Sequence, residues 1–476
     1  MSGSLVAFAL LATAYFGVLA TLGILASRRS SRSPEEYFLA GRGLGKVVLF
    51  MALFGTNCTT FVLVAIPAVA WQHGVGIFGL NAAVVALGVP LTFLLIGLPA
   101  RAQAARLGAL TPAELYAKKL DSKAVGLVLF GAFTLYTIPY MVQGVKGTAL
   151  VMSQATDGVL PTWLSGLCVL MIVMLYTSLG GMRGTAWTNV FQGALFMLFM
   201  ACAFVLIPMR MGGFGTAMEK VRAVDENLLR VGGDYALFQP TAWASWGLVI
   251  STTVIAFPHM LSRLLSAADD ETTRSVCRFY PLALVALWIP AVLLGVLGRG
   301  AFPELERPDT LFYLMSEEFL PPWLGGVAFL AILSATMSTL DAQILTLSSM
   351  LVRDGLPSSS RSPRTEVRLG RIFIFAVAMC VYVLSLLWGD SLFDISRRAF
   401  EGYTTLVPTL FLGVRWRRFS ASGAIASITV ANLVLWAGWN FDGFALFGFL
   451  PVFWAFVAGI LSAVVVSLTS GPRESS

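Results

Sequence analysis

Three oxygen-bearing positions in the segment 331–345 have the spacing of half a cation site. Ala335 is followed by Ser338 and Thr339 at i+3 and i+4. On a helix, the Ala335 carbonyl therefore points toward the turn that carries both hydroxyls. A small hard cation takes several oxygen ligands, so a second segment with free carbonyls must supply the rest. Alternatively, the hydroxyls only hydrogen-bond carbonyls of their own helix.

Ionisable residues inside apolar segments are the next candidates, because burying a charge in a membrane is costly. Asp341 lies three residues after Ser338 and either tunes the ion site or pairs with a basic side chain. Lys146 lies deep in the segment 124–152, where it anchors a carboxylate substrate, forms a salt bridge to Asp341 or Glu401, or snorkels toward a membrane interface. These alternatives remain open for both residues.

A charged cluster near the start of the segment 391–414 is predicted to lie away from the central site. Asp394, Arg397, Arg398 and Glu401 lie within two helical turns and can pair locally. Their place near the predicted outer surface favours a vestibule or gate, where the adjacent arginines could attract an anionic solute.

Composition decides what kind of elements position these groups. The 476 residues are 57% hydrophobic and 12% charged, whereas soluble domains are roughly 45–50% apolar and about 25% charged. The long apolar runs fit membrane helices of about 20 residues and exclude the short alternating strands of a membrane barrel. We therefore expect an all-α polytopic protein in a lipid bilayer.

About thirteen transmembrane helices can be placed along the chain. The predicted spans are 4–27, 46–71, 76–100, 124–152, 161–180, 186–208, 241–266, 279–300, 322–351, 371–388, 391–414, 421–440 and 446–469. We group them as one domain, 1–476. It has an extra N-terminal helix (4–27), a first five-helix repeat (46–208), an inverted second repeat (241–414) and two C-terminal helices (421–469).

Two of these spans contain interruptions at matching positions. Span two carries the sequence GTNCTT at 55–60, and span seven carries Phe257, Pro258 and His259. Broken helices at equivalent places in two halves indicate the central site of a transporter, although Gly and Pro are also tolerated in membrane helices generally. The side chains that we expect near a solute are Thr59, Thr60, Gln143, Lys146, Phe257 and His259.

The charge pattern predicts orientation. The net charge of +7 comes from basic residues in short loops, which the positive-inside rule explains without nucleic acid. The positive-inside rule predicts a cell-membrane protein whose N-terminus lies outside the cell and whose C-terminus lies in the cytoplasm. The five cysteines lie within or at the ends of apolar runs and indicate neither a disulfide framework nor a metal site.

Four motifs, in order, resemble the sodium:solute symporter family, which includes proline, pantothenate, sugar and monocarboxylate symporters. They are YFLAGRGLG at 37–45, GGMRGTAWTNVFQG at 180–193, PHMLSR at 258–263 and the segment 331–345. The resemblance extends from about residue 34 to about residue 435. It implies a LeuT-like core of two inverted five-helix repeats that imports solute by alternating access.

The resemblance also implies a sodium site. Its ligands would be the carbonyls of Gly55 and Cys58 from span two, the carbonyl of Ala335 and the hydroxyls of Ser338 and Thr339. Na⁺ would be the coupling ion, with no covalent cofactor.

Two departures from the family concern charge. Some members carry an acid where this chain has Asn57, and many carry one where it has Asn189. Because the second acid is linked in some relatives to an additional sodium or to sodium release, we expect one sodium per cycle. A proton-coupled or uncoupled mode stays open.

The predicted function is sodium-coupled import of a small organic solute, with a short monocarboxylate preferred. A proline-like amino acid or another small solute is the alternative within the family. A membrane sensory module with the same fold and a passive channel are rivals from other classes. The chain has two histidines and no convergent catalytic set, so we expect no enzymatic activity.

Overall fold

The computed structural model describes residues 3–30, 33–156, 158–232, 235–356, 361–389, 392–441 and 446–470. The predicted ranges 46–208, 241–414 and 421–469 therefore include a few positions (157, 357–360, 390–391 and 442–445) outside the described residues. Among the described residues, the backbone is helical apart from turns, loops and one isolated bridge between Leu44 and Ala267.

The first half of the chain forms ten α-helices. They are α1 (Gly3–Ser30), α2 (Pro34–Leu39), α3 (Lys46–Asn57), α4 (Ile66–His73), α5 (Gly76–Thr92), α6 (Leu98–Leu107), α7 (Pro112–Lys119), α8 (Lys123–Ala155), α9 (Thr162–Arg210) and α10 (Phe214–Val224). Two π-helical turns, η2 (Phe61–Ala65) and η3 (Phe93–Gly97), lead into α4 and α6.

The second half forms ten more. They are α11 (Pro240–Ala256), α12 (Pro258–Leu265), α13 (Asp270–Ala301), α14 (Leu311–Phe319), α15 (Pro322–Met350), α16 (Pro363–Leu387), α17 (Leu392–Thr404), α18 (Val407–Arg415), α19 (Ala421–Asn440) and α20 (Pro451–Thr469).

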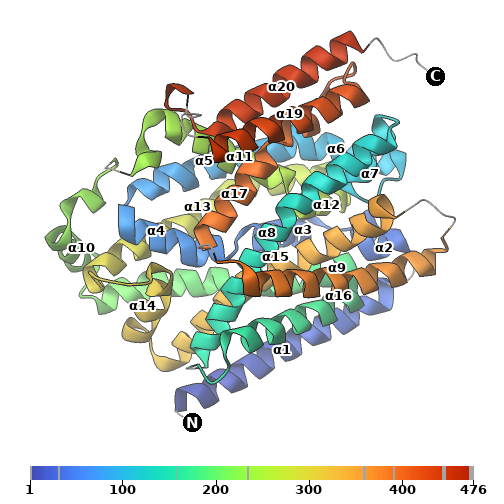
Figure 1. The fold of residues 1–476 in the computed structure, drawn as a ribbon. Helices are drawn as coiled ribbons and strands as arrows, with labels where there is room; N and C mark the ends of the chain where they lie inside the picture. The colour runs from blue at the N-terminus through green and yellow to red at the C-terminus, as the bar shows by residue number, and fades with distance from the viewer. Residues whose placement is uncertain are drawn as a thin grey trace.

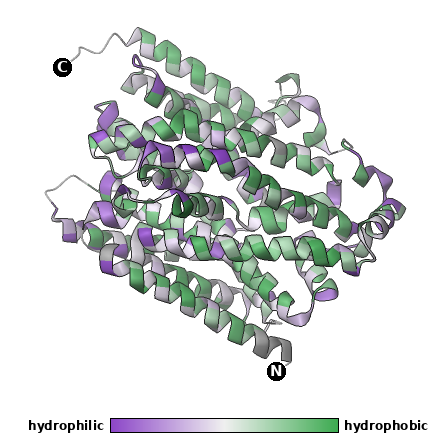
Figure 2. Cartoon of the chain, turned by 180° about the vertical axis from the view of Figure 1, so that it is seen from behind, coloured by the Kyte–Doolittle hydropathy of each residue, from purple (hydrophilic) through white to green (hydrophobic). Residues whose placement is uncertain are grey.

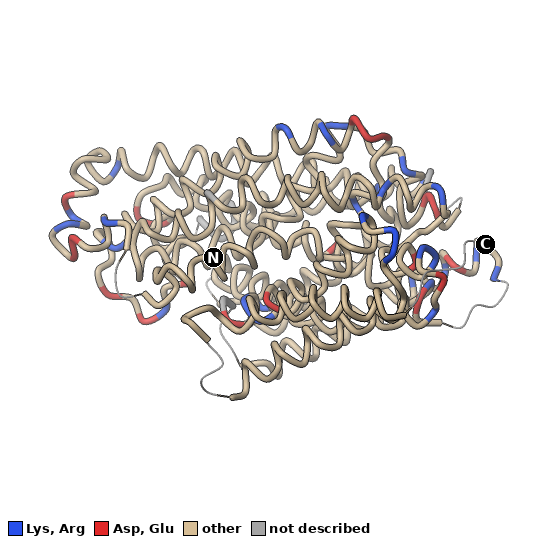
Figure 3. The backbone as a smooth tube through the Cα atoms, turned by 90° about the horizontal axis from the view of Figure 1, so that it is seen from above, with Lys and Arg blue, Asp and Glu red and all other residues tan. Residues whose placement is uncertain are grey.

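The long helices run side by side as one bundle (Figure 1). In that view α1 lies along one edge and the paired helices α19 and α20 along the opposite edge. Hydrophobic residues dominate the long helices (Figure 2), and Lys, Arg, Asp and Glu gather mainly at the two ends of the bundle (Figure 3). This distribution is that of a multi-pass membrane protein.

Nine helices of the described chain are long and apolar enough to cross a membrane, or up to eleven when each bent pair counts as one span. The prediction of thirteen spans is higher because it counts two parts of the chain differently. The predicted spans 161–180 and 186–208 are the two parts of α9, which meet at the non-helical Gly181, and the span 391–414 is divided into the shorter helices α17 and α18. A count of thirteen therefore stays a prediction.

Helix α9 contains a break at Gly181, whose φ and ψ of 55° and −150° are not helical. A straight helix of that length would extend far beyond a hydrocarbon core of about 30 Å. Only glycine fits this position, because a Cβ on Gly181 would lie 2.5 Å from the Tyr37 carbonyl oxygen.

The two interrupted spans are bent in the structure. The pair α3 and η2–α4 bends by 54°, and the pair α11 and α12 bends by 51°. Of the nine unbroken spans of the described chain, Pro322–Gly355, which contains α15, is the most deeply buried. Helix α15 packs against α3, α8, α9 and α12. The predicted cation half-site thus lies at the centre of the bundle.

Candidate functional site

The break in span two exposes backbone oxygens beside α15. Helix α3 ends at Asn57, and Cys58 has an extended conformation (φ −93°, ψ 92°) before the chain resumes as η2 at Phe61. Carbonyls in the last turn of a helix lack an intrahelical partner. Such carbonyls are tolerated at membrane depth only where they are buried in protein or line a cavity.

Ser338 and Thr339 close the gap between the two elements. The Ser338 hydroxyl lies 2.8 Å from the Gly55 carbonyl oxygen and 2.9 Å from the Ala335 carbonyl oxygen. The Thr339 hydroxyl lies 2.8 Å from the Thr56 carbonyl oxygen and 3.3 Å from the Ala335 carbonyl oxygen. Five oxygens from two helices therefore converge in one buried place.

This oxygen cluster fits the chemistry of sodium, which takes unwound backbone carbonyls and hydroxyls as ligands. Of the residues predicted from sequence, the structure brings Gly55, Ala335, Ser338 and Thr339 together. Cys58 lies at the break itself, where its N–H donates to the Phe54 carbonyl at 3.1 Å.

A second layer around the cluster was not predicted. The Asn189 amide donates to the Thr56 hydroxyl at 2.9 Å and to the Ser338 carbonyl at 3.1 Å. The Thr56 hydroxyl also donates to the Ser338 carbonyl at 3.1 Å. In the sequence, Asn189 differs from many family members by the charge it lacks, and Thr56 carries no signal beyond its place in the broken segment.

A small cavity of about 30 Å³ lies next to the same breaks. Its lining is mainly aromatic and apolar, with the polar side chains of Asn57, Thr59 and Thr253. Of the predicted solute residues, Thr59 and Phe257 line it, and Tyr140, Trp288 and Phe400 join them. We call this the central cavity.

The sequence profile of the Sodium:solute symporter family matches residues 37–431. The chain belongs to the sodium:solute symporter family. A sodium/proline symporter of Staphylococcus aureus (strain JH9) is 24% identical over 485 residues, which cover 96% of this chain and 92% of the relative. As a family member, the protein carries out sodium-coupled symport of a solute and is a transporter rather than an enzyme.

Two solved structures share the fold of this symporter. A substrate-bound, outward-open Na⁺-coupled sialic acid symporter has a TM-score of 0.82 at 16% identity and covers 98% of both chains. A nucleobase-cation-symport-1 family transporter in a closed conformation has a TM-score of 0.62 at 14% identity and covers 92% of this chain and 94% of the other. The LeuT-like fold with broken helices in spans two and seven is thereby confirmed.

Thr60, Gln143 and His259 lie next to the central cavity of the symporter rather than in its lining. The Gln143 amide donates to the Thr60 hydroxyl at 2.7 Å, which joins α8 to the broken span. The His259 ring stacks on Phe257 with centroids 5.2 Å apart. All three side chains are buried.

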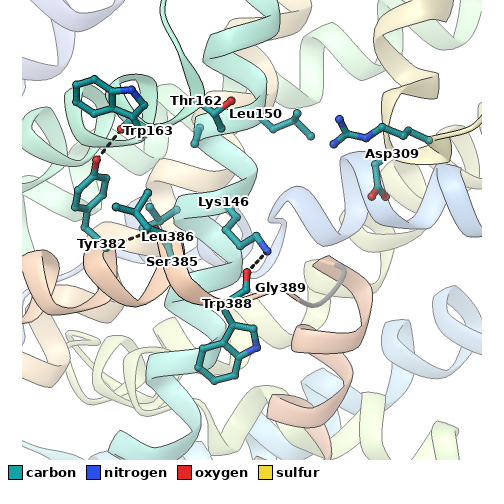
Figure 4. A pocket seen from close by; sticks show the side chains of 14 residues that line it. Lys146, Leu150, Thr162, Trp163, Asp309, Tyr382, Ser385, Leu386, Trp388 and Gly389 are labelled. Atoms are coloured by element: carbon teal, nitrogen blue, oxygen red, sulfur yellow. Dashed lines mark hydrogen bonds between the residues drawn. The ribbon is translucent and has the colours of Figure 1, made fainter.

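Lys146 lies apart from this group. Its amine donates to the Trp388 carbonyl at 2.7 Å, and it lines a separate cavity of about 570 Å³ between α8, α9, α16 and the segment before α14. Figure 4 shows the lysine side chain reaching toward the end of α16, with Asp309 across the cavity. The predicted pairing with Asp341 or Glu401 is not seen, since those acids bind Arg263 and Arg397.

Asp341 is fully buried and pairs with Arg263 of α12 at 3.5 Å. Its other oxygen accepts hydrogen bonds from Tyr176 at 3.0 Å and Thr188 at 3.4 Å, both on α9. Of the two roles left open by the sequence, the structure thus contains the ion pair. The pair lies one turn beyond Ser338 on α15.

The charged residues of α17 pair partly as expected. Arg397 donates to Glu401 at 2.9 Å, and Trp439 of α19 donates to the other Glu401 oxygen at 2.7 Å. Arg398 lines a third cavity, of about 540 Å³, between α8, α17 and α19. A vestibule role for Arg397 and Arg398 stays a prediction.

Proposed function

We propose that this symporter imports a small organic solute with a carboxylate group, a short monocarboxylate being the preferred class, and that Na⁺ binds between α3 and α15. The observation that carries the sodium assignment is the set of hydroxyl to carbonyl contacts from Ser338 and Thr339 to Gly55 and Thr56. Cys58 would add its carbonyl from the break.

The lining of the central cavity supports a small solute with an apolar body. Phe61, Tyr140, Phe257, Trp288 and Phe400 provide apolar surface, while few polar groups are present to fix orientation. A sugar would need many more hydrogen-bond partners. The amino end of the helix that resumes at the break favours a carboxylate, as helix amino ends do in discontinuous membrane helices.

Sodium binding and solute binding are coupled because both sites include residues of the broken span α3–α4. Sodium ligands and cavity residues both belong to the broken span, so an ion that holds α3 against α15 also fixes the position of Thr59. The solute then binds more tightly, and by linkage it raises sodium affinity equally. Movement of the broken helices relative to the rest of the bundle would expose both sites to the other side.

Proline or a similar amino acid is the second candidate, because the Staphylococcus aureus relative is named a sodium/proline symporter and aligns over nearly the whole chain. A sensory role that uses the same fold remains a further alternative. It would be supported by ligand binding without transport.

A thermal-shift screen with reconstituted uptake decides among these candidates. Short monocarboxylates, proline, sugars and vitamins are each tested with and without Na⁺. We expect a monocarboxylate such as pyruvate to raise the melting temperature only when Na⁺ is present and to accumulate in proteoliposomes. Stabilisation and uptake confined to proline would reject the preferred class.

We further propose a cell-membrane location with the N-terminus outside and the C-terminus in the cytoplasm. The start of α1 and the end of α20 lie at opposite ends of the bundle (Figure 1), which supports an odd number of spans. Protease or epitope accessibility at each terminus tests the orientation.

A further inference from the structure

One face of α12 carries three polar side chains that the sodium site does not use. His259, Ser262 and Arg263 are spaced i, i+3 and i+4, so they share a face of the helix. Relative exposure is 0% for His259 and Arg263 and 2% for Ser262. We call these residues the α12 polar face.

Several polar atoms of this face have no hydrogen-bond partner among the described residues. They are both ring nitrogens of His259, the Ser262 hydroxyl, and Nε and Nη1 of Arg263. Buried polar atoms are satisfied in the great majority of cases, and an unsatisfied buried donor of a charged group is especially costly. Water or a ligand is therefore expected to reach this face during the transport cycle.

The ion pair with Asp341 leaves other N–H donors of the Arg263 guanidinium unused. The Arg263 Nη2 to Asp341 distance of 3.5 Å exceeds the 2.7–2.9 Å typical of charge-assisted hydrogen bonds. Asp341 in turn accepts a shorter bond from Tyr176, at 3.0 Å. The guanidinium thus keeps N–H groups that could bind an incoming acceptor.

The α12 polar face lies between the central cavity and a group of backbone contacts that closes one end of the bundle. His259 stacks on Phe257, which lines the cavity. Beyond Arg263, the Leu44 N–H donates to the Ser266 carbonyl at 3.1 Å, and the Ala268 N–H donates to the Leu44 carbonyl at 3.0 Å. Arg101 adds hydrogen bonds to the carbonyls of Ala267 and Ala268. The charge pattern predicts that this closed end faces the cytoplasm.

We propose that the α12 polar face is a transient binding site for the carboxylate of the solute on its way from the central cavity to the cytoplasm. This inference rests on the proposed import of a carboxylate. A guanidinium presents N–H donors in a planar array that matches a carboxylate, and the imidazole and hydroxyl supply further donors along the same face. Separation of Leu44 from Ser266 and Ala268, the residues that follow α12, would open the path.

The test measures the electrostatic preference of the face directly. Ser262→Cys is made in the full chain with the five native cysteines replaced, and inside-out vesicles without sodium are treated with anionic or cationic methanethiosulfonate reagents. We expect the anionic reagent to react about tenfold faster, within the range of electrostatic steering, and pyruvate to slow it. Arg263→Gln should abolish the preference, and Arg263→Lys, the matched control, should keep it.

The proposal is overturned if the cysteine does not react from the cytoplasmic side, if the cationic reagent is faster, or if Arg263→Gln leaves the preference unchanged. His259→Cys provides the same measurement should Ser262→Cys fail to fold. Pyruvate uptake by the cysteine-bearing parent chain tests the proposed function separately. A preference for the anionic reagent without pyruvate uptake would reject pyruvate as the solute and support the α12 polar face as an anion site. Pyruvate uptake without that preference would reject the α12 polar face as a carboxylate site.

Discussion

At the scale of single residues, the hydroxyls of Ser338 and Thr339 connect two helices. Each contacts a carbonyl on its own helix and another on α3, so each joins the enclosed helix α15 to the broken span. The alternative that these hydroxyls bond only carbonyls of their own helix is therefore wrong. The second carbonyl converts two ordinary helix-bonded side chains into half of a polar site between helices.

Replacing both hydroxyls tests the sodium assignment. We expect Ser338→Ala combined with Thr339→Ala to raise the sodium concentration for half-maximal uptake at least about tenfold, equivalent to about 1.4 kcal/mol of binding free energy, because two oxygen ligands are lost. Uptake in proteoliposomes over a sodium series measures this. Thr336→Ala removes a buried hydroxyl of the same helix whose one partner among the described residues is the Ile332 carbonyl, and it should change little. Unchanged sodium dependence of the double variant would reject the site.

Lys146→Gln separates the two roles of this lysine. Because the amine binds the Trp388 carbonyl outside the central cavity, we expect affinities for acids and for a neutral analogue such as pyruvamide to change by the same factor. Binding measured by thermal shift with each compound checks this. A loss confined to acids would instead assign Lys146 as the carboxylate anchor.

At the scale of elements, the two helix breaks have different local causes. Proline at position 258 lacks a backbone donor, and α11 ends immediately before it, at Ala256 with Phe257 as its cap. The break after Asn57 has no proline, and its carbonyls bind α15 instead. The sequence predicts both breaks and the family resemblance implies the partner of the first, whereas the contacts themselves depend on the packing of α3 against α15.

Gly181→Ala should destabilise the fold because it adds a Cβ in a positive-φ conformation beside the Tyr37 carbonyl. We expect a loss of about 2 kcal/mol or more, measured as a lower melting temperature in detergent. Gly131→Ala is the control, since a Cβ there meets nothing within 4 Å and alanine favours a helix. Equal melting temperatures for the two variants would contradict the strained turn.

Glu114 links α7 through Arg353 to η7 (Leu351–Gly355), the π-helical turn that follows α15 at the predicted cytoplasmic side. Burial raises the pKa of Glu114, but the hydrogen bond and charge of Arg353 outweigh it, so the pKa lies below its ordinary value. A depressed carboxylate pKa stabilises the fold above the unfolded pKa of about 4.3 and loses that effect as pH falls through the folded pKa.

Glu114→Gln should therefore lower the melting temperature at neutral pH, and the difference from the parent should shrink in acid. Melting curves between neutral and acidic pH measure this. Glu219→Gln, on the exposed face of α10, should behave like the parent at every pH. A pH-independent deficit would show that the ion pair is not the cause.

At the scale of the whole molecule, the charges around the sodium site bear on stoichiometry. Asn57 and Asn189 are neutral, and Asp341 is paired with Arg263. We therefore expect one sodium per solute, because no unpaired carboxylate of the described residues adjoins the oxygen cluster to neutralise a second ion. Reversal potentials of the coupled current in proteoliposomes give the ratio. A ratio of two would contradict this reasoning.

The sequence by itself determined the class of the protein and one half of its ion site. Apolar runs too long for soluble helices identify a membrane bundle, and the i+3 and i+4 spacing of Ser338 and Thr339 from Ala335 places three oxygens together. These inferences need only local geometry and hydropathy. They depend on residues close together in the chain.

The tertiary structure decided the contacts between distant segments that the family resemblance did not imply. It paired Asp341 with Arg263 rather than Lys146, placed Thr56 and Asn189 around the oxygen cluster, and put Lys146 in a cavity of its own. The physical reason is that which side chain meets a buried charge depends on how the helices pack. Periodicity within each helix specifies a face, but not the neighbour that the face contacts.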